Sequence, residues 1–120
     1  MGLRLWSIVV DSADHRALAR WWAGALDWQV FHEDDEQVVV CTHDMRFPGI
    51  VFVPVDDAKS TKNRLHLDFA PDDRDAEVER LVTLGASRVD VGQTDEATWV
   101  VLADPEGNEF CVLRAREGGM

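Results

Sequence analysis

The chain has 120 residues, and its 12 Lys and Arg against 23 Asp and Glu give a formal net charge of −11 at pH 7. This length suits one domain with a substantial hydrophobic core. A surface of this charge repels phosphate backbones and anionic lipids, so we expect neither nucleic acid nor a membrane as a partner. No apolar stretch is long enough to span a bilayer, and we expect no signal peptide. Cys41 and Cys111 form no CxxC pair or disulfide framework, as expected of free thiols in a reducing, cytoplasmic location.

Hydrophobic patterning predicts one helix and four strands in the first half of the chain. The helix begins after Asp14, whose carboxylate suits the N-cap position, and continues to about Leu26 with an apolar stripe at helical spacing. The strands are predicted at residues 5–10, 28–32, 37–42 and 50–55.

The second half repeats this order after a polar, partly basic connection. Its helix begins after Asp72 or Asp73 and ends near Gly85, a residue type favoured just past helix ends. The strands are predicted at residues 64–69, 87–91, 98–103 and 109–114, with a tight turn at 104–108 and a fraying end at 117–120.

The first of these strands alternates cleanly between apolar and polar residues. Two sets of side chains therefore point to opposite faces. We expect Leu65, Leu67 and Phe69 to pack under the helix, and Arg64, His66 and Asp68 to face a cleft.

The signals in residues 5–55 recur in residues 64–114 at a constant displacement of 59 positions. Ser7 precedes Asp14 by seven residues, as His66 precedes Asp73. A repeat of this size is one supersecondary unit used twice. The sequence therefore predicts an α+β fold in one domain, residues 1–120, built from two βαβββ modules. The modules span about 1–56 and 64–116 with a linker at 57–63, and their curved, partly open mixed sheet encloses a cleft with the helices outside.

Three segments resemble the vicinal oxygen chelate superfamily, which includes glyoxalases, extradiol dioxygenases and bleomycin-resistance-type binding proteins. They are VVDSAD before the first helix, NRLHLDF at the start of the second half, and DPEGNEFCVL at the end. The resemblance covers nearly the whole chain and is most similar to the glyoxalase-like domains. It implies the glyoxalase/bleomycin resistance fold and a homodimer, but the scaffold hosts many chemistries.

Metal-dependent members of the superfamily carry ligands at four positions. Carried over by motif, these are Ser7, Phe52, His66 and Cys111, and the displacement of 59 relates them in pairs. The family pattern has His, Gln or Glu at each position, which only His66 matches, and Cys111 stands where a Glu is usual. We therefore predict no metal cofactor. The alternative is a rearranged Zn, Fe or Ni site in which Glu109 or Asp68 joins His66 and Cys111.

Several side chains suit ligand binding or proton transfer, and each has a simpler structural role. His66 with Asp68 or Glu109 forms either an acid–base pair or a polar lining. Arg64 binds an anionic ligand or pairs with an acidic neighbour. Trp99 forms a stacking wall if its side of the strand lines the cleft, and core packing otherwise. Phe52 offers a ring for stacking, and Cys111 is either a nucleophile beside His66 or an inert buried thiol.

The leading interpretation is a protein that binds a small aromatic or anionic molecule in a metal-free cleft, with His66 and Glu109 available for acid–base catalysis. The predicted lining consists of Ser7, Phe52, Arg64, His66, Asp68, Trp99, Glu109 and Cys111. The alternative is a metal-dependent lyase, isomerase or dioxygenase that uses His66, Cys111 and Glu109. A third possibility is a structural or regulatory partner domain with a vestigial cleft.

Overall fold

The fold is known from a computed structural model that describes residues 2–89 and 99–115. The chain divides into two compact units, 1–58 and 59–120. The division falls inside the linker predicted at 57–63. The two units are described separately below.

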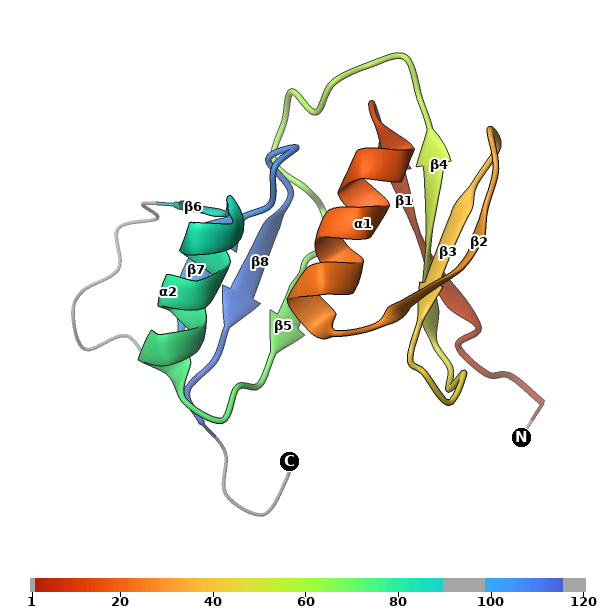
Figure 1. Cartoon of the computed structure of the whole chain (residues 1–120). Coiled ribbons are helices and arrows are strands. Elements are labelled where there is room, and N and C mark those ends of the chain that lie inside the picture. Colours follow the sequence, from red (N-terminus) through yellow and green to blue (C-terminus); the bar gives the residue numbers. More distant parts are fainter. Residues whose placement is uncertain (1, 90–98, 116–120) are drawn as a thin grey trace. The chain divides into compact units, whose positions relative to one another are not determined.

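The first unit is a four-stranded mixed sheet with one helix on one face (Figure 1). In chain order its elements are β1 (Ser7–Ser12), α1 (His15–Leu26), β2 (Gln29–Glu33), β3 (Val38–Cys41) and β4 (Gly49–Pro54). The sheet order is β1-β4-β3-β2, with β1 parallel to β4 and the other pairs antiparallel. The core lies between α1 and the sheet and contains Leu18, Ala19, Trp22, Val38, Val40, Ile50 and Phe52.

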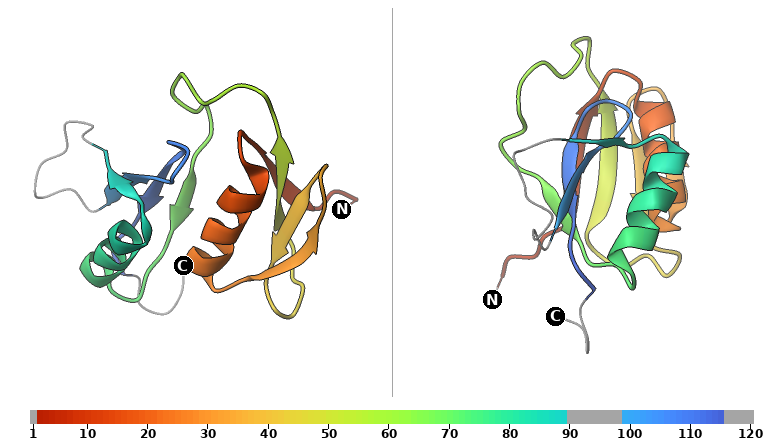
Figure 2. Two further views of the ribbon diagram at one scale, coloured as in Figure 1. Left: turned by 45° about the horizontal axis from the view of Figure 1, so that its top comes forward. Right: turned by 90° about the vertical axis from the view of Figure 1, so that its left-hand side faces the viewer.

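The second unit repeats this arrangement. Its elements are β5 (Leu67–Phe69), α2 (Arg74–Leu84), β6 (Ser87–Arg88), β7 (Val100–Ala103) and β8 (Glu109–Val112), and its sheet order is β5-β8-β7-β6. The turned views in Figure 2 show each helix against one face of its own sheet. The core contains Val78, Leu81, Leu102, Phe110 and Val112. The predicted α+β class with two βαβββ units is confirmed.

Strand pairing relates the two halves position by position. Val9 lies opposite Val51 in the parallel pair β1–β4, and Asp68 lies opposite Cys111 in the parallel pair β5–β8. The displacement from Val9 to Asp68 is 59 residues, but that from Val51 to Cys111 is 60. The halves therefore do not repeat at one constant displacement.

This one-residue difference corrects the predicted position of Phe52. Successive side chains of a strand point to opposite faces, so an error of one residue moves a side chain to the other side of the sheet. Phe52 is the counterpart of Val112, not of Cys111. Its side chain is 0 % exposed and lies opposite the equally buried Val38 in the core. Phe52 therefore does not line the open face of the sheet.

Leu65 also departs from its prediction. The strand begins at Leu67, three residues later than the predicted start at residue 64, and Leu65 is 85 % exposed. It does not pack under the helix, whereas Phe69 does contribute to the core through an edge-to-face contact with Phe110 at 5.7 Å between ring centroids. The predicted strand residues 90, 91 and 98 and the frayed end 117–120 lie outside the described residues.

Both helices begin as their sequences predict. The Asp14 carboxylate accepts a hydrogen bond from the Ala17 amide at 3.2 Å, and the Asp73 carboxylate accepts one from the Ala76 amide at 3.1 Å. Asp73, not Asp72, is therefore the second cap. Helix α2 ends at Leu84 and is capped by Gly85, whose φ of 123° is readily accessible only to glycine. In the described part of the chain, no helix is both long and apolar enough to cross a membrane.

The cap of α2 gives the first testable prediction. Replacing Asp73 by Ala leaves the Ala76 amide without its side-chain acceptor, so we expect a loss of about 1 kcal/mol in the free energy of unfolding. Urea denaturation followed by circular dichroism measures the loss. Asp72→Ala removes the same charge from the neighbouring exposed residue and should change stability by less than about 0.5 kcal/mol. Equal losses in the two variants would contradict the assignment.

Candidate functional site

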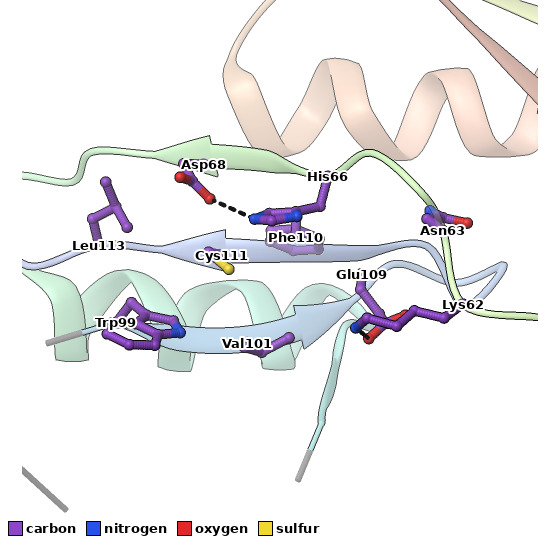
Figure 3. Close-up of a pocket in the computed structure, with 10 residues that line it drawn as sticks. All are labelled: Lys62, Asn63, His66, Asp68, Trp99, Val101, Glu109, Phe110, Cys111 and Leu113. Carbon is purple, nitrogen blue, oxygen red and sulfur yellow. Dashed lines mark hydrogen bonds and ion pairs between the residues drawn. The ribbon is translucent and has the colours of Figure 1, made fainter. Parts of the chain in front are cut away.

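A pocket of about 410 Å³ lies on the face of the second sheet that is turned away from α2 (Figure 3). Strands β5, β7 and β8 and the segment before β5 supply its side chains. The lining consists of Lys62, Asn63, His66, Asp68, Trp99, Val101, Glu109, Phe110, Cys111 and Leu113.

The period of two along the strands explains why these side chains share a face. On β8 and just beyond it, Glu109, Cys111 and Leu113 face the pocket, while Val112 between them is buried on the helix side. At β5, His66 and Asp68 face the pocket in the same way. The sheet therefore brings together two pairs of polar or reactive side chains, His66 with Asp68 and Glu109 with Cys111, from segments that lie more than forty residues apart in the sequence.

Three of these side chains form a cluster. His66 Nε2 lies 3.3 Å from Asp68 Oδ1, and the thiol of Cys111 completes a group whose ligand-type atoms all lie within 4.8 Å of one another. His66 and Asp68 are exposed, whereas Cys111 is buried. The cluster therefore has one side in the sheet and one side open to the pocket.

The surroundings of Cys111 disfavour its thiolate. Burial raises the pKa of the Cys111 thiol, and the negative charge and hydrogen bonding of Asp68 raise that pKa further. The thiol is therefore protonated at neutral pH in the free protein. An inert thiol agrees with this electrostatic setting better than an activated nucleophile does.

Glu109 is paired with lysines. Its carboxylate lies 3.1 Å from Lys62 Nζ and 3.8 Å from Lys59 Nζ. Asn63 donates a hydrogen bond to Asn108 at 3.2 Å, which holds the lysine-bearing segment against the turn before β8. Glu109 thus serves as the counter-ion of the basic segment, and the acidic partner of His66 in the structure is Asp68.

The turn at 104–108 fixes the start of β8. Asp104 is buried, and its Oδ1 accepts hydrogen bonds from the backbone amides of Glu106 and Asn108, each at 2.9 Å. Gly107 has a φ of 87°, as a tight turn at a glycine allows. This hydrogen-bonded turn fixes the residue at which β8 begins and therefore the face of the sheet on which Glu109 and Cys111 lie.

The apolar part of the pocket centres on Trp99. This side chain is 42 % exposed and lies beside Val101 on β7 (Figure 3). Leu113 adds a further apolar side chain. Arg64 is exposed and stands outside the lining, so the basic residue that reaches this pocket is Lys62.

Ser7 lies in a different pocket, on the corresponding face of the first sheet. This pocket has a volume of about 640 Å³ and includes Val9, Val51 and the contacting rings of Trp6 and Phe47, whose centroids are 4.1 Å apart. The described residues that line it include no Asp or Glu. Whether the two pockets join into the single predicted cleft stays a prediction.

Several residues that line the two pockets were not predicted to do so, although the sequence contains features that point to some of them. Lys62 belongs to a small basic cluster in a strongly acidic chain, and Val101 alternates with the core residues of its strand. Trp6 is 61 % exposed just before β1, where its apolar character suggested a strand residue. Asn63 left no distinct signal, because its contact with Asn108 joins residues far apart in the sequence.

The four-position metal arrangement of the superfamily fits this chain poorly. The Ser7 hydroxyl is a weak ligand, and Val51, the structural counterpart of Cys111, has no donor atom. His66 and Cys111 do lie close together, but the third donor beside them is Asp68. The set of His66, Cys111 and Glu109 expected for the alternative function is not the set that clusters.

Two βαβββ units, each with an open sheet face, define an α+β protein of the glyoxalase/bleomycin resistance fold. The sequence model of the family described as a glyoxalase-like domain matches residues 7–113. The chain belongs to this family and hence to the vicinal oxygen chelate superfamily that its motifs resemble. A search of curated proteins finds no match.

Solved structures with the same fold belong to proteins of diverse function. A glyoxalase/bleomycin resistance protein/dioxygenase family enzyme from Burkholderia phytofirmans has a TM-score of 0.71 at 17 % identity, covering 92 % of this chain and 97 % of that one. The trypanothione-dependent glyoxalase I of Leishmania major has a TM-score of 0.71 at 11 % identity, covering 94 % and 87 %. The bleomycin-binding protein of Streptomyces verticillus has a TM-score of 0.62 at 16 % identity, covering 97 % and 100 %. At these identities the likeness shows the fold alone.

The effect of Asp68 on Cys111 gives the second prediction. In a Cys41→Ser background, Asp68→Asn removes the charge that opposes the thiolate, so the pKa of Cys111 should fall and its alkylation by iodoacetamide at pH 8 should accelerate. The alkylation rate is followed by mass spectrometry. Asp72→Asn, which removes an exposed charge next to the α2 cap, should leave the rate unchanged. A rate in Asp68→Asn no faster than that of the parent would contradict this account.

Proposed function

We propose that this glyoxalase-like protein binds a small, flat organic molecule, aromatic or anionic, in the pocket of its second half and holds it by side chains without a metal. The observation that carries the proposal is the Trp99 ring, 42 % exposed at the edge of a cavity of about 410 Å³. Such a volume suits a small molecule. An exposed ring beside apolar neighbours offers a flat surface for stacking.

The charges around the pocket support an anionic group on the ligand. Lys62 and Lys59 share a single carboxylate, that of Glu109, so this end of the pocket carries one more positive than negative charge. The chain as a whole has a net charge of −11, so a locally positive end is a departure from its surroundings. A carboxylate or similar anion on the ligand would meet Lys62 directly.

His66 gives this binding site a group for proton transfer. An imidazole titrates near neutral pH, and Asp68, 3.3 Å away, orients the ring and balances its charge when it is protonated. Glu109, the other residue expected to be catalytic, is placed to hold the lysines and through them the ligand. We therefore assign proton transfer, where it occurs, to His66 and anion positioning to the Glu109–Lys62 pair.

The alternative function, a metal-dependent lyase, isomerase or dioxygenase, has one observation in its favour. His66 and Cys111 do cluster with a third donor, although that donor is Asp68 instead of Glu109. Ligand binding that disappears when a chelator removes bound metal would favour this alternative over the metal-free proposal.

We also propose that the protein is cytoplasmic, as its free thiols favour, and that it is a homodimer, as the family resemblance implies. Light scattering coupled to size-exclusion chromatography measures the mass against the 13.5 kDa of one chain. A mass of one chain over the working concentration range would contradict the dimer.

The third prediction tests the position of the binding site with 2-naphthoate, a flat aromatic anion, and with the uncharged 2-naphthamide. With a chelator present, we expect both to bind and the anion to bind more tightly. Trp99→Ala should weaken binding about three- to tenfold, because stacking contributes about 0.5–1.5 kcal/mol. Isothermal titration calorimetry measures the affinities.

Trp6→Ala is the matched control, because it removes an exposed tryptophan from the pocket of the first half. It should leave the affinity unchanged. A loss of binding in Trp6→Ala alone would move the site to the first half. The absence of binding by these probes and by a broad thermal-shift screen would overturn the proposal in favour of a partner domain.

A further inference from the structure

Both lysines of the chain, Lys59 and Lys62, pair with the carboxylate of Glu109, whereas the other ten basic residues are arginines. An arginine holds a carboxylate through two donors of a planar fork, but a lysine is a point charge on a flexible stem. A lysine therefore changes partners without breaking a two-point contact. The two lysines beside Glu109 suit an ion pair whose members exchange.

The two lysines are held differently. The side chain of Lys59 is 20 % exposed, and its stem passes over the turn before β8, where a Cβ at Gly107 would lie 3.9 Å from Lys59 Cδ. The side chain of Lys62 is 76 % exposed and reaches Glu109 from the lining of the pocket (Figure 3). Lys59 is not among the residues that line the pocket. Lys59 is thus the fixed partner of Glu109, and Lys62 is the one with room to move.

An amide relay anchors the segment that carries both lysines. Asn108 donates hydrogen bonds from Nδ2 to both carboxylate oxygens of the buried Asp104, at 3.2 and 3.0 Å. The Oδ1 of Asn108 is thereby left to accept the hydrogen bond from Asn63 at 3.2 Å. This contact does not involve a lysine, so the segment stays in place when Lys62 leaves Glu109.

The burial of Glu109 decides what happens to the carboxylate when Lys62 moves. Its side chain is only 16 % exposed, and a carboxylate in such surroundings is costly without a cationic partner. In the structure Lys62 Nζ is the closer partner at 3.1 Å, while Lys59 Nζ lies 3.8 Å away, less than one ångström farther. A small movement of Lys59 therefore replaces the contact that Lys62 gives up.

We infer that Lys59 is a positioning residue, which keeps Glu109 neutralised so that Lys62 can turn to the anionic group of the ligand. The inference rests on the proposed function and adds to it a residue outside the pocket and an exchange of ion pairs. Without the Lys59 charge, binding an anion through Lys62 would leave Glu109 unpaired, and ligand affinity would fall by that cost. An uncharged ligand makes no such demand.

The first experiment compares the affinities for 2-naphthoate and 2-naphthamide by isothermal titration calorimetry with a chelator present. Lys59→Met removes the charge and keeps an unbranched, flexible stem. We expect the ratio of naphthoate to naphthamide affinity to fall about two- to fivefold, as for the loss of a partly exposed ion pair. The naphthamide affinity itself should not change.

Three further variants separate charge compensation from a structural effect. Adding Glu109→Gln to Lys59→Met removes the carboxylate that needs a partner, so the parental ratio should return. Lys59→Arg keeps the charge and should keep the ratio. Arg64→Gln removes an exposed charge from the same segment outside the lining and should also leave the ratio unchanged.

The second experiment needs no ligand. Acetic anhydride acetylates lysine amines, and mass spectrometry follows the rate at Lys62. In Lys59→Met the carboxylate of Glu109 is no longer shared, so Lys62 should be held more firmly and react about two- to fivefold more slowly. Adding Glu109→Gln should reverse the slowing, and Arg64→Gln should leave the rate unchanged.

Two results would overturn the inference while the proposed function stands: an unchanged ratio in Lys59→Met, or a reduced ratio that Glu109→Gln does not restore. If neither probe binds the parent protein, the proposed function is wrong. Acetylation then decides on the lysine exchange alone, and a rate at Lys62 that is no slower in Lys59→Met would contradict it.

Discussion

The two-residue period of β4 and β8 decides which side chains belong to the core and which to the pockets. A strand packed against a helix on one side must present its apolar set inward, and the alternate residues are then committed to the open face. In β8 this places Phe110 and Val112 in the core and turns Glu109 and Cys111 outward. The contacts of Glu109 with the lysines and the position of Cys111 beside Asp68 depend on this register.

Two separate ion-pair systems divide the pocket into regions with different properties. Glu109 is neutralised at one end by Lys62 and Lys59, while His66 and Asp68 pair at the other. Each carboxylate has its own nitrogen-bearing partner: Asp68 lies beside the His66 ring, and Glu109 lies beside Lys62 and Lys59. The two ion-pair systems therefore occupy separate parts of the pocket lining.

Local sequence signals predicted the elements well because their causes are local. The caps at Asp14 and Asp73 and the turn at 104–108 depend on side chains that bond to amides a few residues away. The lining of the pocket depends on pairing between β5 and β8, which lie about forty residues apart, and the contacts of Glu109 with Lys59 and Lys62 arise only there. Those partners could not be read from spacing along the chain.

The wrong prediction for Phe52 came from applying a single displacement to every strand of the internal repeat. The helices and first strands of the two halves align at 59 residues, so extending the same displacement to the last strand was reasonable. Relative to the first half, the segment before β7 is longer by three residues and the β7–β8 connection is shorter by two, and this net gain of one residue changes the displacement to 60. In a loop such a residue costs little free energy, but in a strand comparison it exchanges the two faces. Aligning the two halves at 59 residues therefore assigned Phe52, a core residue, to the pocket.

With the register corrected, the two open faces differ systematically. His66, Asp68, Glu109 and Cys111 correspond to Ser7, Val9, Gly49 and Val51. Each titratable side chain of the second half is thus replaced in the first half by a small or apolar one. The same scaffold can accept either set, because these positions point away from the core and their identity does not affect the packing against the helix. The inward residues of both halves determine the packing against the helix, whereas the outward residues do not contact the core. The titratable donors of the second half therefore have no equivalents at the matching positions of the first half, whose pocket takes its other polar side chains, His32, Gln37, Cys41 and Arg46, from other positions.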